Sequence, residues 1–130
     1  MRTSFIVALS CAMAACSSDP TSPGASVPEC TGAVTITVSS GTSPTFNWIP
    51  TCHLFFVLVE LGADDYWLVI TDSTNAITPP VQYGVLPTGA RQRATATPLQ
   101  TGQTYDVNLA RWTGPGAEDG TLIGNQNFTP

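Results

Sequence analysis

Apolar and polar residues alternate in short runs along most of the chain. In residues 33–40, AVTITVSS, valine and isoleucine alternate with threonine and serine, and residues 104–112, TYDVNLARW, follow the same rule. A period of two residues predicts β-strands that bury one face. Residues 53–61, HLFFVLVEL, are apolar almost throughout, which is typical of a central strand.

Further strand-like runs are separated by glycine, proline and other turn-forming residues. No run shows a helical period. About seven short strands in about 100 residues predict an all-β fold, a single antiparallel two-sheet sandwich over residues 30–130. The additional runs cover residues 45–50, 66–71, 81–86, 91–99 and 121–129.

Leu99, Gly102 and Tyr105 are spaced three residues apart just before an alternating run. This spacing resembles the end of a fibronectin type III domain, where a leucine closes one strand, a glycine turn follows and a tyrosine opens the next strand. The resemblance implies a tyrosine corner, whose hydroxyl bonds to nearby backbone. Trp48 is similar to the tryptophan of that family's second strand. Thr101 stands where the family usually has proline, so an immunoglobulin-like strand order remains an alternative.

Residues 1–15 have the form of an export signal, with Arg2 followed by an apolar stretch. That stretch is shorter than the roughly 20 apolar residues needed to span a bilayer. Residues 13–16, MAAC, resemble a bacterial lipobox, which implies cleavage before Cys16 and lipidation of its thiol. Cys11 follows a poorer match, and an ordinary cleaved signal peptide is the other alternative.

Residues 16–29 are rich in serine and proline, a composition typical of a tether. Ser17 directly after the lipidated cysteine resembles lipoproteins that are sorted to the outer membrane. We therefore expect an exported domain, lipid-anchored in the bacterial cell envelope through Cys16.

Cys30 and Cys52 are the cysteines left after cleavage and acylation, and an exported compartment is oxidising. We expect them to form a disulfide closing a loop of about 23 residues, worth roughly 3 kcal/mol in the chain-entropy model. A metal site is the alternative, but only His53 lies nearby as a further ligand.

The composition argues against several function classes. The chain carries a formal charge of −5 and no lysine. Because nucleic-acid binding needs a clustered basic surface, we expect no nucleic-acid partner. His53 lacks the partners that nucleophilic catalysis requires, so we expect neither an enzyme nor a cofactor.

Acidic residues occur together at three predicted turns, where they are favoured for local hydrogen bonds. Calcium binding is the alternative, although the spacing of an EF-hand is absent. These positions are Asp64-Asp65, Asp72 with Asn75, and Glu118-Asp119.

The strand parity predicts an exposed apolar surface. Glu60 should avoid the core, so alternate residues on its strand should face outward with it. In a fibronectin-like sandwich this strand neighbours residues 104–112. Exposed apolar surface often marks an interaction site, and we expect the partner to be an envelope or extracellular protein. The candidate interaction face is Leu54, Phe56, Leu58, Trp67 and Trp112.

Carbohydrate binding is the alternative function. Aromatic rings with polar loops around them can stack on sugars, and Tyr66, Trp67, Tyr83 and Trp112 are the candidates for such a platform.

Overall fold

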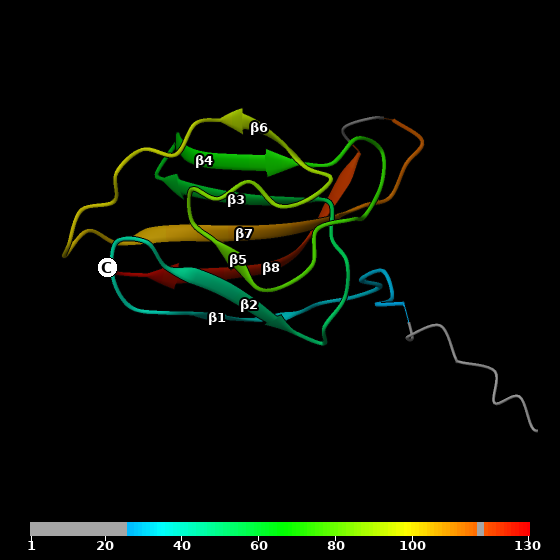
Figure 1. Cartoon of the computed structure of the whole chain (residues 1–130), viewed down its shortest axis with the longest axis horizontal. Coiled ribbons are helices and arrows are strands. Elements are labelled where there is room, and N and C mark those ends of the chain that lie inside the picture. Colours follow the sequence, from blue (N-terminus) through cyan, green and yellow to red (C-terminus); the bar gives the residue numbers. More distant parts are fainter. Residues whose placement is uncertain (1–25, 117–118) are drawn as a thin grey trace, which may run out of the picture.

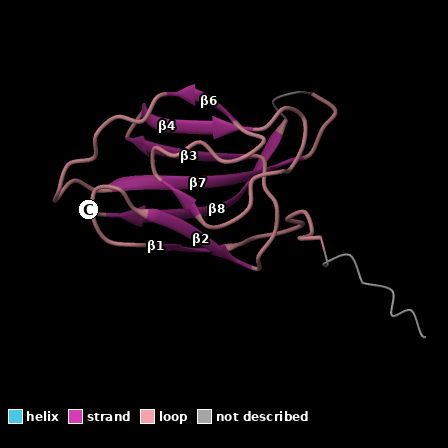
Figure 2. Cartoon of the chain, viewed as in Figure 1, coloured by secondary structure: helices cyan, strands magenta, loops and turns pink. Residues whose placement is uncertain are grey.

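The computed structural model describes residues 26–116 and 119–130, and this part of the chain is a sandwich of strands without a helix (Figures 1 and 2). The predicted all-β fold of two antiparallel sheets is confirmed, with eight strands where about seven were expected. The proposed signal peptide and Cys16 lie outside the described residues. The strands are β1 (Thr35–Val38), β2 (Thr45–Ile49), β3 (Phe56–Leu61), β4 (Asp64–Ile70), β5 (Val81–Gln82), β6 (Arg91–Ala94), β7 (Tyr105–Trp112) and β8 (Gly120–Phe128).

The smaller sheet has three strands in the order β1-β2-β5. β1 and β2 form a hairpin in which Val38 lies opposite Phe46. Gly41 in the connecting turn has a φ of 93°, a left-handed conformation that costs glycine little. β5 pairs with the other side of β2, where Val81 lies opposite Phe46.

The larger sheet has five strands in the order β6-β4-β3-β7-β8. The predicted pairing of the strand in residues 53–61 with that in residues 104–112 is present, as β3 with β7. Val57 lies between Val69 and Leu109 across three strands, and this row faces the smaller sheet. Register shifts interrupt the β3–β4, β4–β6 and β7–β8 ladders.

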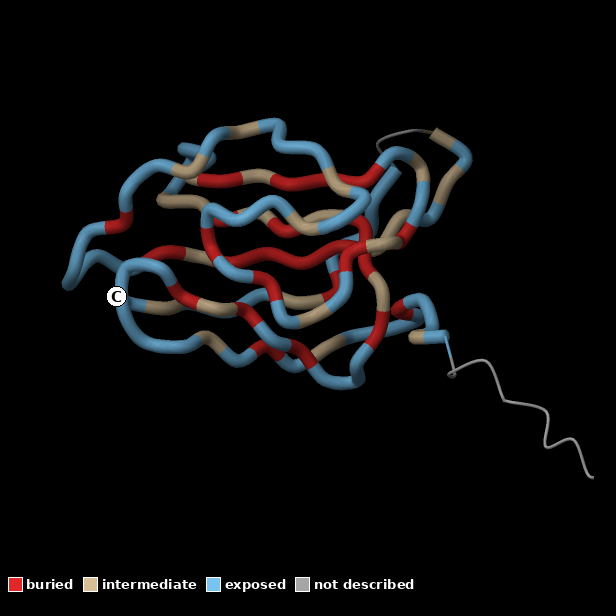
Figure 3. The backbone as a smooth tube through the Cα atoms, in the orientation of Figure 1, coloured by how far each residue is buried: buried red, intermediate tan, exposed pale blue. Residues whose placement is uncertain are grey.

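Apolar side chains fill the space between the two sheets. Buried stretches gather along β3, β4 and β7 (Figure 3). Each large apolar side chain taken fully out of water contributes about 1.5–3 kcal/mol. The fully buried side chains of greatest volume are Trp48, Trp67, Tyr105, Phe46, Phe55, Leu54, Ile77 and Leu109.

A disulfide joins Cys30 and Cys52, as predicted. It links the segment before β1 to the segment after β2. The indole N–H of Trp48 donates to the Cys52 carbonyl at 2.9 Å, and the Cys30 N–H donates to the His53 carbonyl at 2.8 Å. His53 is therefore part of a short backbone pairing beside the disulfide.

Tyr105 opens β7 with its ring buried and its hydroxyl turned back toward the preceding loop. The backbone N–H of Gln100 donates to that hydroxyl at 3.0 Å. Gly102 in the same loop has a φ of 84°. This is the hydrogen bond expected of a tyrosine corner.

The described N-terminal residues and the C-terminus lie at opposite ends of the sandwich (Figure 1). The disulfide and the loops after β2, β4 and β7 gather at the N-terminal end. Within the described part of the chain, no helix is long and apolar enough to cross a membrane.

Candidate interaction face

The outer surface of the five-stranded sheet carries a group of apolar side chains. Phe56 lies opposite Ile70, and Leu58 lies opposite Leu68, in neighbouring positions of β3 and β4. Phe56, Leu58 and Leu68 are partly exposed. Together they form what we call the outer face: Phe56, Leu58, Leu68 and Ile70.

A shallow hollow of about 230 Å³ lies on the outer face. Phe55 and Arg93 complete its lining, so an arginine of β6 stands at its rim. The rings of Phe55 and Phe56 lie 5.9 Å apart between centroids. The hollow can take an apolar side chain, but it is smaller than the cavities of about 300–1,000 Å³ that hold small-molecule ligands.

The sequence places apolar residues on this surface because β3 is apolar on both faces. Val57 and Val59 point into the core and are fully buried, so Phe56 and Leu58 must point the other way. Leu122 of β8, 56% exposed, extends the apolar surface where it lies opposite Ala110.

A polar ladder closes the other end of the outer face. The Asn108 side-chain amide donates to Glu60 Oε1 at 2.7 Å. The Asn125 amide in turn donates to Asn108 Oδ1 at 2.6 Å. Glu60 therefore avoids the core, as predicted, and the ladder satisfies Asn108 despite its burial.

Phe56 and Leu58 are the members of the candidate interaction face that lie on the outer face. The placement of Leu54 on an exposed face is wrong, because Leu54 is 0% exposed. The chain bends before β3 starts at Phe56, and Leu54 instead pairs with Ile77 through an isolated bridge. The inward–outward alternation of β3 therefore does not extend back to Leu54.

The exposed placement of Trp67 is also wrong, because Trp67 is 0% exposed. It lies opposite Val59, whose side chain is in the core, so both point inward. The indole N–H of Trp67 lies 3.4 Å from Gln92 Oε1, and its ring meets that of Tyr83 edge-on.

Trp112 is half-buried and packs on its own turn rather than on the outer face. Its indole N–H donates to the Gly116 carbonyl at 2.7 Å, and a Cβ on Gly114 would come within 2.7 Å of its ring. The Asn75 side chain holds its backbone, accepting from Trp112 N–H at 2.6 Å and donating to its carbonyl at 3.2 Å.

Leu68, Ile70 and Arg93 belong to the site but were not among the predicted residues. The signal was present in the run of residues 66–71, YWLVIT, which is apolar at consecutive positions. Only the pairing of β4 with β3 shows that Leu68 and Ile70 share a face with Phe56 and Leu58.

The aromatic residues considered for sugar stacking are engaged within the domain. Tyr83 is buried, and its hydroxyl lies 2.7 Å from the Thr97 carbonyl and 3.1 Å from that of Tyr66. Burial raises the pKa of Tyr83 to about 12. Tyr66 is half-buried, with its ring edge-on to that of Tyr105.

The acidic positions that the structure describes do not converge. Asp72 forms an ion pair with Arg91 at 2.8 Å, and Asp119 Oδ2 accepts from the Gly116 N–H at 2.6 Å. Asp64 and Asp65 begin β4, so their predicted place in a turn is wrong. Glu118 lies outside the described residues. Among the described residues no three His, Cys, Asp or Glu side chains are grouped to hold a metal ion.

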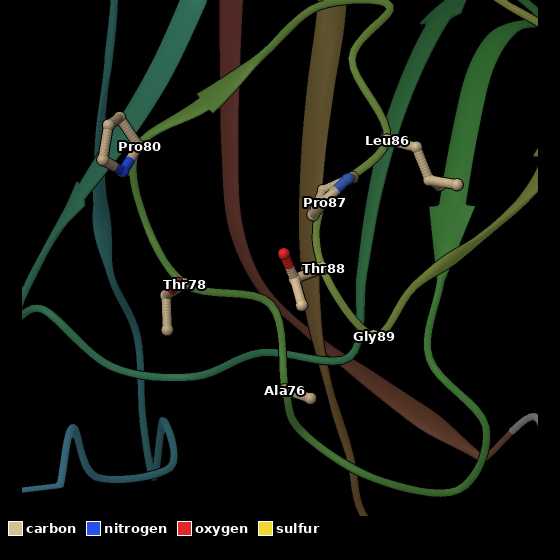
Figure 4. A pocket seen from close by; sticks show the side chains of 7 residues that line it. All are labelled: Ala76, Thr78, Pro80, Leu86, Pro87, Thr88 and Gly89. Atoms are coloured by element: carbon tan, nitrogen blue, oxygen red, sulfur yellow. The ribbon is translucent and has the colours of Figure 1, made fainter.

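A larger hollow of about 620 Å³ lies between the segments that precede and follow β5 (Figure 4). Thr78 and Pro80 come from the first segment, and Leu86 and Thr88 from the second. The side chains that line it include no titratable group, so this hollow could enclose a molecule but its side chains could not act as an acid or a base. Its lining is Ala76, Thr78, Pro80, Leu86, Pro87, Thr88 and Gly89.

Comparison of the chain with protein-family models, with curated proteins and with solved structures finds no match.

Proposed function

We propose that this protein is a lipid-anchored interaction module of the bacterial cell envelope that binds another protein through the outer face. The lipid would be carried by Cys16, and residues 17–29 would connect it to the sandwich. The binding itself would be non-enzymatic and would need neither a metal nor a cofactor.

The hollow on the outer face is the observation that carries the proposal. Apolar side chains line it on the solvent side of a sheet, and Arg93 and the Glu60–Asn108–Asn125 ladder provide a polar surround. Protein interfaces combine an apolar centre with a polar rim in this way. The outer face is less suited to stacking on a sugar, because its one partly exposed aromatic ring, that of Phe56, already lies beside the ring of Phe55 and the rest of the face is aliphatic.

Site-specific photo-crosslinking tests the interaction. A photoreactive amino acid at Leu58 or Leu68 is expected to give one discrete adduct in intact cells. The same amino acid at Asn47, exposed on β2 of the opposite sheet, is the matched control. The double variant Phe56→Ser/Leu58→Ser should keep the far-UV circular dichroism of the fold while the adduct from Leu68 disappears. Equal adducts from Asn47 and Leu68 would contradict binding through the outer face.

Labelling with a palmitate analogue tests the anchor separately. Cys16→Ala is expected to abolish the label, and Cys11→Ala is the matched control that should retain it. Undiminished label on the Cys16→Ala chain would refute lipidation at Cys16 without touching the proposal for the outer face.

A further inference from the structure

The described sandwich has four edge strands, β1 and β5 in one sheet and β6 and β8 in the other. An edge strand presents unpaired backbone N–H and C=O groups, which can pair with another chain. Natural sheets protect such edges with short strands, prolines, bulges or charged side chains.

Two of the four edges carry these protections. β5 is two residues long and follows directly on Pro79 and Pro80. β6 contains Arg91 and Arg93, and its ladder with β4 is interrupted by a register shift.

The other two edges lack charged residues and lie beside each other. β1 reads TITV and β8 reads GTLIGNQNF, all uncharged. At one end the two strands meet, since the Val34 N–H donates to the Ile123 carbonyl at 2.9 Å. At this end each strand covers the backbone edge of the other, so neither edge is free to pair with another chain.

Beyond that contact the strands separate around a groove of about 490 Å³, which we call the β1–β8 groove. Ile36 and Val38 line it from β1, and Gln126 and Phe128 from β8. Gln126 lies opposite the fully buried Val107, yet it is exposed. The sandwich is thus open at this point, where a neighbouring strand would otherwise cover the position.

Backbone groups on both sides point toward the groove. In an antiparallel ladder these groups alternate between the partner and the opposite side. Because the Val34 N–H points away from β2, the N–H groups of Ile36 and Val38 do so too. The Ile123 carbonyl, at the register shift of the β7–β8 ladder, points away from β7. Farther along β8, the Asn127 carbonyl accepts from the Gln126 side-chain amide at 2.8 Å.

We propose that the β1–β8 groove takes an extended, uncharged segment of a different polypeptide as an added strand. The backbone edges define the occupant as an extended chain, because only a strand offers donors and acceptors at matching intervals. The absence of charge along β1 and β8 favours an uncharged guest, whose alternate apolar side chains would face Ile36, Val38 and Phe128. This surface is separate from the outer face, so the proposal goes beyond the function proposed above.

A peptide with the sequence VTITVSS, copied from residues 34–40, is the probe. Titrated into the isotope-labelled full chain, it is expected to give saturable amide shifts in NMR spectra at Ile36, Val38, Asn125 and Asn127. Asn127→Lys, which places a charge on the exposed edge, should weaken binding at least about tenfold, the equivalent of roughly one backbone hydrogen bond. Thr121→Lys makes the same charge change on β8 outside the groove and should leave the affinity unchanged.

The same peptide N-methylated at alternate residues cannot donate to an edge and should not bind. Equal binding of the methylated peptide, no saturation with the unmodified one, or shifts confined to β5 and β6 would overturn the proposal. Self-association of the chain without peptide, abolished by Asn127→Lys, would also overturn it, because a second copy would then be the occupant. None of these outcomes depends on the outer face, which is tested by Phe56→Ser/Leu58→Ser.

Discussion

Gly124 of β8 lies against Val34, so close that a Cβ on residue 124 would stand 2.8 Å from Val34 Cγ2. Ile36 is almost as near, with its Cδ1 at 3.1 Å from the same point. The glycine therefore allows the segment around β1 to approach β8 and join the two sheets along one side.

Gly124→Ala is expected to push β1 away from β8 and lower the free energy of unfolding by about 1–3 kcal/mol, the usual cost of overpacking. Urea denaturation measures the change. Gly32→Ala is the matched control, because a Cβ there meets no atom within 4 Å. Equal stability of the two variants would show that β1 can move aside at no cost.

Tyr105→Phe is expected to destabilise the fold by about 1 kcal/mol, because it leaves the Gln100 N–H without the hydroxyl to which it donates. Thermal unfolding measures the loss. Tyr66→Phe is the control, since among the described residues the Tyr66 hydroxyl has no hydrogen-bond partner. Binding at the outer face should survive Tyr105→Phe, and a specific loss of binding by the folded variant would contradict a purely structural role.

Asn75→Ala is expected to cost about 1–3 kcal/mol, because both the N–H and the carbonyl of Trp112 lose their side-chain partner. Hydrogen exchange at the Trp112 amide should accelerate more than exchange in the middle of β7. Asn127→Ala, at an exposed position, should leave both measurements unchanged. Unaltered exchange at Trp112 in Asn75→Ala would mean that water replaces the lost bonds.

Tyr83 makes stability depend on pH in alkaline solution. Its pKa is raised from an ordinary 10.0 to about 12, so between these values the folded state keeps a proton that the unfolded state has lost. The contribution of Tyr83 to the free energy of unfolding is therefore complete below pH 10 and should be lost as the pH rises toward 12. Tyr83→Phe should flatten this decline in urea titrations at pH 9 and pH 11. A slope identical to that of the unchanged chain would assign the effect to other groups.

The strand pattern predicted the architecture well because alternation reports directly on burial. Counted from the outward-facing Glu60, Phe55, Val57, Val59 and Leu61 should turn inward; the first three are fully buried, whereas Leu61 is only partly buried. The same parity failed one residue earlier, at Leu54, where the chain has not yet entered the ladder. Alternation describes a strand only within its hydrogen-bonded length.

The candidate site was less predictable because it depends on pairing between strands. Trp67 faces inward because its partner in the β3–β4 ladder is Val59, and a register shift follows at Glu60. No local pattern in residues 64–71 reveals that shift. Likewise, nothing in the sequence around Gln126 indicates that its position faces an open groove rather than solvent beyond a regular sheet.

The disulfide between Cys30 and Cys52 has a mechanical consequence. β1 and β2 lie inside the covalently closed loop between these residues. Tension applied through the chain before Cys30 passes across the bridge to Cys52 and onward into β3, without loading the hydrogen bonds between β1 and β2. If a partner holds the outer face while the chain before Cys30 is pulled, the force therefore acts on the strands of the five-stranded sheet. The hydrogen bonds of the β1–β2 hairpin carry none of it.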